Sequence, residues 1–371
     1  MKVGLMVPNY ARWFRSEGIF ATCEKGKELG LDALCFVDHV MATPRQYVGM
    51  GNGYMDCWTA MTYLAAVTDM QGWKPILTNA VVVIPYRPAI LQAKQIATID
   101  SLSGGRIMVG AGSGYMETEF TDLGLDVTKR GDMTDEYLAC MKELWVHPVA
   151  SFHGKYVNFD DRTISVRPAQ QPHPPVLYGS HGARPRRRIA ERYQGTIGGP
   201  RGGSVGRDAD SQKAFENDIA DLNRLWKEHG RAGKPFQMAY VRGHLTANMS
   251  DVGKNVMKGV TAEGLALTEA DTEIRSGPRI NRTSEERVYG GAHPLIHVST
   301  MVDDLRRLES AGTDLAIIWL ESYRYGNMNN QEMQLSQMEL LAEHVLPKVN
   351  RDKKPIQMDF DGKLHTAFAT P

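Results

Sequence analysis

The sequence has no excess of charge of either sign. Its 371 residues include 43 lysines and arginines and 43 aspartates and glutamates. A protein that binds nucleic acid or an anionic membrane surface usually presents a basic field, and this composition provides none. We therefore expect a small-molecule partner, with no nucleic acid and no membrane.

Cysteine is scarce, and its spacing does not suggest a metal site or a disulfide framework. The four cysteines are Cys23, Cys35, Cys57 and Cys140, and no two of them form a Cys-x-x-Cys pair. Each lies in an apolar segment, which is typical of reduced, packed thiols in a cytosolic protein.

Long apolar runs are also missing at the N-terminus. After Lys2, only a five-residue apolar run precedes Pro8. Such a run is too short for the apolar region of a signal peptide or for a membrane span. The sequence therefore predicts a cytoplasmic protein.

Several motifs of common enzyme classes are absent. The glycines at 110, 112 and 114 follow a GxGxG spacing instead of GxGxxG, and the residues after them do not open an apolar helix. The match to the dinucleotide-binding fingerprint is therefore weak. No His-x-His pair follows a predicted strand. His293 and His297 stand four apart in a proline-containing stretch, so we predict no metal site.

Short apolar runs alternate with amphipathic stretches along the chain. Eight such runs, each followed by a predicted helix or loop, predict a parallel α/β sheet closed into a (β/α)₈ TIM barrel; an open doubly wound sheet is the alternative. The predicted strands are Val3–Val7, Ala33–Val37, Ile76–Ile84, the run from Ile107 to the glycines, Val176–Tyr178, Gly195–Ile197, Phe236–Leu245 and Leu315–Leu320.

Three segments interrupt this rhythm. His147–Pro174 reads as an excursion between units four and five, with short strand-like pieces. Ala266–His297, before the eighth strand, has no clear periodicity and reads as a lid or a mobile loop. The chain from Arg351 is polar, so we expect one barrel domain over residues 1–350 and a C-terminal tail over 351–371.

In a TIM barrel, chemistry is found where the strands end, so the residues that follow each apolar run are the candidates. Asp38 and His39 follow the second run, and His39 can exchange a proton near neutral pH. Tyr115 and Glu117 belong to the same predicted rim. We expect His39, Asp38 and Glu117 to be the catalytic residues.

The glycine run is the densest cluster of this kind. Gly110, Gly112, Ser113, Gly114 and Tyr115 end the fourth predicted strand. Glycine has no Cβ, so alternating glycines let a planar or phosphorylated ligand approach the backbone. A simple turn would need one or two glycines, and we therefore expect these five residues to bind a cofactor.

A second cluster follows the fifth strand. Gly179, Ser180, His181 and Gly182 precede a predicted helix. Backbone N–H groups at a helix N-terminus, with a serine hydroxyl beside them, are suited to phosphate. The run predicts a phosphate-binding site.

Several short strings occur together in an order and spacing typical of one family. They are Asp38-His39, Arg87-Pro88, Ala97, Asp100, Leu102–Arg106, the VGAGSGY run with Glu119-Phe120, Arg130-Gly131 with Glu136, Phe152 with Gly154, and Gln171-Pro172 with Pro174-Pro175. In these strings the sequence resembles the bacterial-luciferase-like superfamily of flavin and deazaflavin enzymes, over about residues 2–195.

The resemblance implies a TIM barrel that binds FMN or the deazaflavin coenzyme F420 at its mouth. It places the ring near Thr78, Asn79 and the glycine run and the phosphate near Ser180–Gly182. It also implies that His39 contacts the reacting face of the ring or the substrate. The glycine run and the Asp-His pair look closer to the F420-dependent branch. The sugar-phosphate dehydrogenases of that branch carry Glu where this chain has Tyr115, which argues against sugar-phosphate oxidation.

Three functions remain open at this point. The first is hydride transfer between F420 and a small organic substrate, with His39 as proton donor or acceptor. The second is a monooxygenase that uses reduced FMN from a separate reductase, and the third is a non-catalytic flavin-binding barrel. The family resemblance also implies a homodimer, with Tyr63 and Leu91 on its interface.

Overall fold

The structure is a computed structural model of the 371-residue chain. It describes residues 1–9, 16–41, 54–179, 183–198, 209–247, 295–320, 331–351 and 355–368. Residues 180–182 of the predicted phosphate cluster and nearly all of the predicted loop 266–297 lie outside these ranges.

Eight parallel strands close into a barrel, which confirms the predicted fold. In the ring, β10 pairs with β12 on one side and with β9 on the other, and the order from β10 is β12, β1, β2, β3, β5, β8 and β9. The strands are β1 (Lys2–Met6), β2 (Ala33–Phe36), β3 (Ile76–Asn79), β5 (Ile107–Gly112), β8 (Val176–Gly179), β9 (Gly195–Ile197), β10 (Phe236–Thr246) and β12 (Leu315–Leu320).

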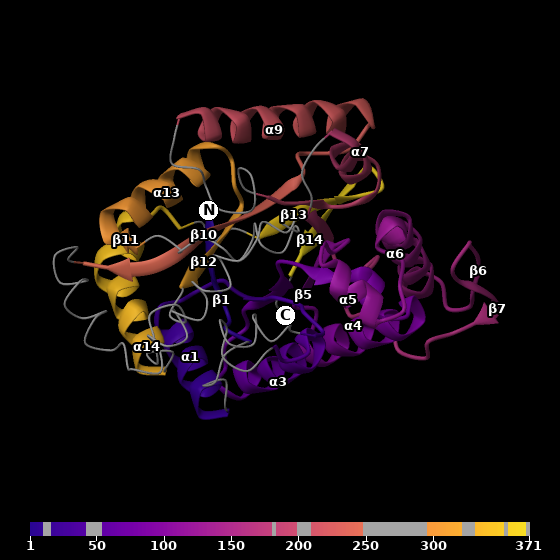
Figure 1. Cartoon of the computed structure of the whole chain (residues 1–371), viewed down its shortest axis with the longest axis horizontal. Coiled ribbons are helices and arrows are strands. Elements are labelled where there is room, and N and C mark those ends of the chain that lie inside the picture. Colours follow the sequence, from indigo (N-terminus) through magenta and orange to yellow (C-terminus); the bar gives the residue numbers. More distant parts are fainter. Residues whose placement is uncertain are drawn as a thin grey trace, which may run out of the picture.

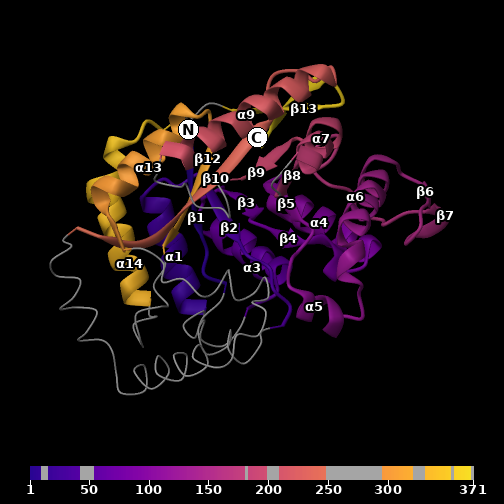
Figure 2. The same cartoon turned by 45° about the horizontal axis from the view of Figure 1, so that its top comes forward.

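Helices surround the strands, as Figures 1 and 2 show. The longer ones in the described ranges are α1 (Ser16–Glu28), α3 (Cys57–Met70), α4 (Ala89–Ser103), α6 (Arg130–Val146), α7 (Ala183–Arg192), α9 (Ala209–Glu228), α13 (Val298–Ser310) and α14 (Gln331–Leu340). A π-helical turn, Leu341–Val345, and a 3₁₀ turn, Leu346–Lys348, continue α14. Among these described helices, none combines the length and apolarity that a membrane crossing requires.

Alternate strand residues build two separate apolar layers. In β2, Leu34 and Phe36 pack into the layer between strands and helices, whereas Ala33 and Cys35 pack into the barrel interior. This follows from the two-residue period of a strand, which sends successive side chains to opposite faces. The interior is therefore a packed core, and sites in such barrels lie at the C-terminal ends of the strands.

The third predicted strand is shorter than expected. It ends at Asn79, and the chain then bends through Ala80 and Val81, whose peptide bond is cis, into the two-residue strand β4 (Val82–Val83). A 3₁₀ turn, Ile84–Tyr86, follows and leads to α4. The bend brings Ala80 and Val81 into the barrel-interior cluster as partly buried residues.

The predicted excursion between units four and five contains an antiparallel hairpin, β6 (Ala150–His153) with β7 (Asn158–Arg162). Further elements were not predicted. They are the short helix α5 (Glu117–Asp122), the 3₁₀ turn Val127–Lys129, the helix α13 and the strand β11 (Leu295–His297), which pairs with the end of β10.

A hairpin forms within the segment that the sequence predicts to be a tail. It consists of β13 (Ile356–Phe360) and β14 (Lys363–Ala367). Ile356, Met358 and Phe360 pack into the barrel-interior cluster. The hairpin thus closes the N-terminal end of the barrel.

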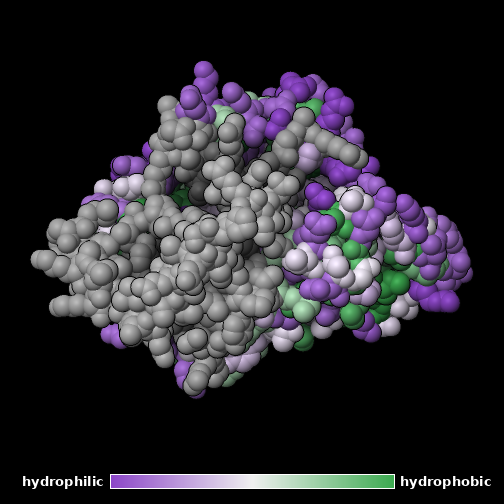
Figure 3. All heavy atoms as spheres, in the orientation of Figure 1, coloured by the Kyte–Doolittle hydropathy of each residue, from purple (hydrophilic) through white to green (hydrophobic). Residues whose placement is uncertain are grey.

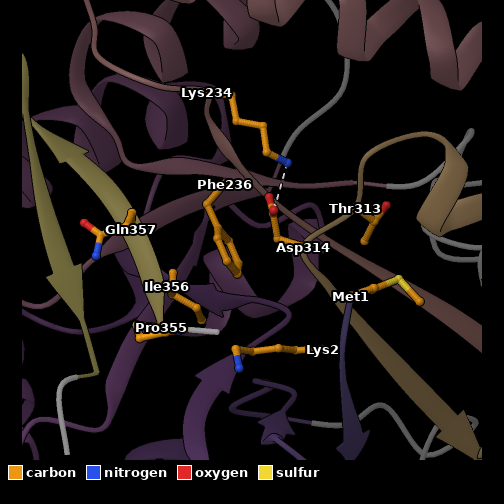
Figure 4. A pocket seen from close by; sticks show the side chains of 9 residues that line it. All are labelled: Met1, Lys2, Lys234, Phe236, Thr313, Asp314, Pro355, Ile356 and Gln357. Atoms are coloured by element: carbon orange, nitrogen blue, oxygen red, sulfur yellow. Dashed lines mark hydrogen bonds and ion pairs between the residues drawn. The ribbon is translucent and has the colours of Figure 1, made fainter. Parts of the chain in front are cut away.

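A pocket of about 160 Å³ lies between this hairpin and the first residues of three strands (Figure 4). Lys2 begins β1, Phe236 begins β10, and Asp314 precedes β12. Lys234 forms an ion pair of 2.8 Å with Asp314. The pocket is at the N-terminal end of the strands, whereas barrel chemistry takes place at the other end.

Candidate functional site

The carboxylate of Glu119 is the centre of a buried network at the C-terminal ends of β2 and β3. Its Oε2 is 3.0 Å from His39 Nδ1 and accepts a hydrogen bond of 2.7 Å from the Tyr86 hydroxyl. Its Oε1 accepts the backbone N–H groups of Val40 and Met41 at 2.7 and 3.1 Å. The Glu119 carboxylate is thus fixed by four groups: the His39 ring, the Tyr86 hydroxyl and two backbone N–H groups.

Local structure explains why these groups meet. His39 lies three residues beyond β2, Tyr86 ends the 3₁₀ turn after β4, and Glu119 lies on α5, which follows β5. Tyr86 also packs edge-on against Phe120, with ring centroids 5.1 Å apart. Three consecutive barrel units thus each contribute one member of the network.

Electrostatics keep Glu119 ionised. Burial alone would raise the pKa of its carboxyl, but the hydrogen bond and charge of His39 and the hydrogen bond from Tyr86 outweigh it, so the net pKa is lowered. An ionised carboxylate can only accept hydrogen bonds. His39 therefore donates through Nδ1, and whenever the imidazole is neutral its Nε2 is the proton acceptor.

Aromatic rings flank His39. The ring of Tyr54 lies 4.6 Å from that of His39, and the ring of Tyr115 lies edge-on at 6.2 Å. Tyr115 is 39% exposed, so it lies at the rim. The imidazole thus lies in a partly apolar setting below the solvent-facing edge of the mouth.

Asp38, the neighbour of His39, is held by different partners. Arg87 donates to both of its oxygens at 2.8 Å, and the backbone N–H of Val83 adds a third bond at 3.0 Å. Arg87 also pairs with Asp56 at 2.7 Å, and Asp56 caps α3 through Thr59 N. Burial would lower the pKa of Arg87, but the carboxylate of Asp38 reverses this and raises it. The cluster joins β2, β4 and α3, which fits a positioning role for Asp38.

The glycine run packs against the protein, contrary to the expectation that a ligand fills the space beside it. A Cβ at Gly110 would lie 1.7 Å from the Asn79 carbonyl oxygen, and a Cβ at Gly112 would lie 2.4 Å from the Val81 side chain. Val81 also covers Gly179. The glycines therefore make room for the bend after β3.

Thr78 and Asn79, the two residues of β3 that the resemblance places near the cofactor ring, have side chains on opposite faces of the strand. Thr78 pairs in register with Cys35 and Met108, which lie in the interior cluster, whereas Asn79 pairs with Phe36 of the outer layer. Both are fully buried, and their side-chain polar atoms have no hydrogen-bond partner in the described part of the chain. Only Thr78 is on the barrel-interior face by strand alternation.

The remaining predicted residues are spread over the rim or fall outside the described ranges. Gly114 has a φ of +74°, which favours glycine, and Ser113 hydrogen-bonds Tyr178. Glu117 is exposed, on the same short helix as buried Glu119. Ser180, His181 and Gly182 are not described. Among the described residues, no group of three or more His, Cys, Asp or Glu side chains could hold a metal ion.

Sequence reasoning missed Glu119, Tyr86 and Arg87 as members of the site. Glu119 and Arg87 did occur in the strings that carry the family resemblance, so a signal was present. Tyr86 follows an apolar run and belongs to none of these strings, so the sequence did not single it out.

Comparison with known proteins identifies the family. A family model described as luciferase-like monooxygenase matches residues 18–273. This is more than half of the chain, and the chain therefore belongs to the luciferase-like monooxygenase family.

Two curated relatives match part of the chain. An uncharacterised protein of Mycobacterium tuberculosis is 34% identical over 182 residues, which are 49% of this chain and 59% of that protein. The FMNH₂-dependent dimethylsulfone monooxygenase of Pseudomonas putida is 39% identical over 111 residues, which are 29% of this chain and 30% of that enzyme. The matches thus span less than two thirds of these relatives' own lengths.

Solved structures share the fold over nearly the whole chain. An F420-dependent secondary alcohol dehydrogenase in complex with an F420-acetone adduct aligns with a TM-score of 0.66 and 17% identity, covering 94% of this chain and 99% of that one. At this identity the likeness shows the fold alone.

Proposed function

We propose that the protein is an oxidoreductase that transfers hydride between coenzyme F420 and a small organic substrate at the mouth of the barrel. The observation that carries this proposal is the network in which Glu119 and Tyr86 fix His39. Hydride transfer to or from a carbon that bears oxygen needs a proton acceptor or donor beside it, and His39 is placed to act as one.

The upper end of the barrel interior fits a planar ring. Ala80 and Val81, which follow β3, and Tyr54 are partly buried and lie against the interior core. Val81 packs against Gly112 and Gly179. These residues would offer the ring an apolar support, and the buried Thr78 hydroxyl lacks a partner in the described part of the chain. An apolar wall with a few polar groups is typical of a cofactor site.

The chain's own residues would move the proton. When bound, F420 supplies the ring carbon that accepts or donates hydride. His39 Nε2 takes the hydroxyl proton of an alcohol as its carbon loses hydride, and returns it in the reverse direction. The ionised Glu119 stabilises the imidazolium that forms, and Tyr86 holds Glu119 in place.

A second candidate is a monooxygenase that uses reduced FMN. The observation that favours it is the 39% identity to a relative named as an FMNH₂-dependent monooxygenase. The same apolar support would hold the flavin ring, and a separate reductase would supply the reduced cofactor. His39 would then donate or accept a proton on the substrate.

A turnover comparison tests the proposal. The purified protein is incubated with F420 and a panel of primary and secondary alcohols, and separately with reduced FMN, oxygen and the same panel. We expect the absorbance of F420 to change with at least one alcohol, and we expect His39→Asn to lose about 100-fold or more in kcat with cofactor affinity within threefold. Oxygen-dependent product with FMN alone would move the assignment to the second candidate, and His39→Asn with unchanged turnover would overturn the role of His39.

We also propose a homodimer through α3 and α4. Tyr63, Ile90 and Leu91 are between 44% and 50% exposed, although they belong to two helices that pack on each other. Figure 3 shows apolar residues gathered in the region of α4 and α6 on the part of the face drawn in colour. A second copy of the chain would cover this surface.

The four cysteines support our proposal of a cytoplasmic location. All are buried and none forms a disulfide. Burial raises the pKa of the Cys23 and Cys140 thiols to about 12, so both stay protonated and unreactive at neutral pH. Buried free thiols of this kind are usual in reducing compartments.

A further inference from the structure

Asn9 lies just beyond the C-terminal end of β1 and is fully buried. Its backbone N–H donates to the Val7 carbonyl at 2.8 Å, which makes a tight turn of the chain at this point. Burying a carboxamide is costly unless its donors and its acceptor are hydrogen-bonded. The hydrogen-bond partners of Asn9 therefore show which parts of the chain its side chain holds together.

The first partner is the end of β2. Asn9 Nδ2 donates to the Val37 carbonyl at 2.8 Å, and Asn9 Oδ1 accepts the Val37 N–H at 3.2 Å. If the register of β1 and β2 continued, Pro8 would lie opposite Val37, and proline has no N–H to donate. The Asn9 side chain therefore replaces this ladder contact and fixes the residue that precedes Asp38 and His39.

The second partner is the segment whose tyrosine packs on His39. Asn9 Nδ2 also donates to the Met55 carbonyl at 3.2 Å, and the Asn9 carbonyl accepts the Met55 N–H at 2.8 Å. Tyr54 precedes Met55, and its ring lies 4.6 Å from the His39 ring at an angle of 46°. Asn9 thus holds the backbone close to both rings of this pair.

The direction of His39 Nε2 depends on the packing of the ring as well as on its hydrogen bond. Glu119 holds the Nδ1 end of the ring. A hydrogen bond at one atom still allows the ring to tilt, and the Tyr54 ring limits that tilt by contact. Misplacing a reacting group by about 1 Å can cost about 100-fold in rate. The position of Tyr54 therefore bears on how well His39 exchanges a proton with a substrate.

We infer that Asn9 is a positioning residue for His39. By linking Val37 to Met55, it keeps the Tyr54 ring packed on the imidazole and so keeps Nε2 directed at the substrate. This inference rests on the proposed function, because it takes His39 as the proton donor or acceptor. A carboxamide does not titrate at neutral pH, so Asn9 itself transfers no proton.

Proton NMR of the cofactor-free protein tests the position of the His39 ring. The His39 signals are identified by their loss in His39→Asn, and their ring-current shifts report the nearby Tyr54 ring. We expect Asn9→Ala to move the His39 ring-proton signals away from their wild-type positions and towards those of Tyr54→Ala.

Gln194→Ala is the matched control. Gln194 is also buried, and its Oε1 accepts the Val176 N–H at 2.9 Å. It therefore joins two neighbouring strands as Asn9 does, but at the N-terminal end of β8, away from His39. We expect both Gln194→Ala and Asn9→Ala to lower the melting temperature, and we expect only Asn9→Ala to move the His39 signals.

Turnover provides a second readout, with F420 and an alcohol that the turnover comparison identifies as a substrate. We expect Asn9→Ala to lose about 10- to 100-fold in kcat with KM within threefold, and we expect a similar loss for Tyr54→Ala. Because Asn9 acts through Tyr54, the double variant should be no slower than Tyr54→Ala alone. Gln194→Ala should keep the wild-type kcat.

Asn9→Asp keeps the test readable if Asn9→Ala does not fold. It preserves the size of the side chain and the acceptor for the Val37 N–H but loses both donated hydrogen bonds, and we expect it to move the His39 signals in the same direction. Unchanged His39 signals in a folded Asn9 variant would overturn the inference, as would a double variant whose loss in kcat is the product of the two single losses. The NMR measurement needs no cofactor, so its failure is distinct from failure of the proposed function.

Discussion

At the scale of single residues, two glutamates on α5 have different environments. Glu117 and Glu119 are two positions apart on a six-residue helix, and only Glu119 is buried against His39. Two positions on a helix differ by about 200° in direction, so one glutamate faces the barrel and the other faces solvent. The sequence could predict that an acid follows the glycine run, but so short a helix has no periodic pattern that would show which one turns inward.

The lowered pKa of Glu119 predicts how stability depends on pH. A carboxyl whose pKa is lowered by folding stabilises the fold above its ordinary value of 4.5, and this contribution is lost as the pH falls through its lower folded-state pKa. We expect Glu119→Gln to reduce the free energy of unfolding by about 1–3 kcal/mol at neutral pH, and we expect the difference from wild type to shrink below pH 4.5.

Urea unfolding of both proteins over this pH range measures the effect. Glu117→Gln is the control, since that side chain is exposed, and it should match the wild type throughout. A difference for Glu119→Gln that stays constant down to acid pH would contradict the role given to its charge.

At the scale of elements, the eight barrel strands could be predicted because buried parallel strands are short apolar runs. The end of β3 could not be predicted, because the run from Ile76 to Ile84 reads as one strand and gives no sign of the bend at Ala80. The helix α13 was missed although its buried Met301, Leu305 and Leu308 have helical spacing. The hairpin β13–β14 was missed because its few apolar residues alternate within a polar segment.

The bend after β3 predicts a steep cost for any side chain at Gly110. A Cβ there would lie 1.7 Å from the Asn79 carbonyl oxygen, which is backbone and cannot rotate away. We expect Gly110→Ala to lower the free energy of unfolding by about 3 kcal/mol or more. Gly131→Ala within α6 is the control: its Cβ meets only Arg188 at 3.5 Å, and it should stabilise by about 0.5–1 kcal/mol. Equal stability of both variants, by chemical unfolding, would refute the packing given for the glycine run.

The C-terminal hairpin is held by a buried ion pair. Asp359 is buried and pairs with Arg231, which also donates to the Ala190 and Tyr193 carbonyls. Replacing one partner of such a pair leaves the other charge buried, which costs about 3–5 kcal/mol. We expect Asp359→Asn to lower the free energy of unfolding by this amount, whereas Asp361→Asn, in the exposed turn, should have little effect. Thermal unfolding compares them, and an Asp359→Asn protein as stable as wild type would show that this ion pair does not hold the hairpin.

At the scale of the whole molecule, the strings that carry the family resemblance mostly hold the barrel together. Arg106 donates to the Ala65 carbonyl and to Asp69 at the end of α3. Glu136 accepts three consecutive backbone N–H groups of the β6–β7 hairpin turn. These contacts explain why the fold could be predicted more fully than the site.

The proposed homodimer predicts that charge on α4 separates the subunits. We expect wild-type protein to sediment as a dimer, and we expect Leu91→Glu to shift it to a monomer, because the exposed Leu91 would place a carboxylate in an apolar interface. Leu364→Glu is the control, since Leu364 on β14 is equally exposed at 50%. Sedimentation equilibrium distinguishes the states. A monomeric wild type, or a dimeric Leu91→Glu variant, would exclude this interface.

The measurement that tests the account most directly is a fluorescence titration of F420 and FMN into three proteins: wild type, Ala80→Leu and Ala311→Leu. Ala80 is partly buried on the proposed ring support, whereas Ala311 is partly buried on the outer side of the barrel. We expect wild type and Ala311→Leu to bind one cofactor equally well and Ala80→Leu to bind it at least tenfold more weakly, with all three equally folded. Unchanged binding by Ala80→Leu, or no binding of either cofactor by the wild type, would contradict the placement of the cofactor at the mouth beside β3.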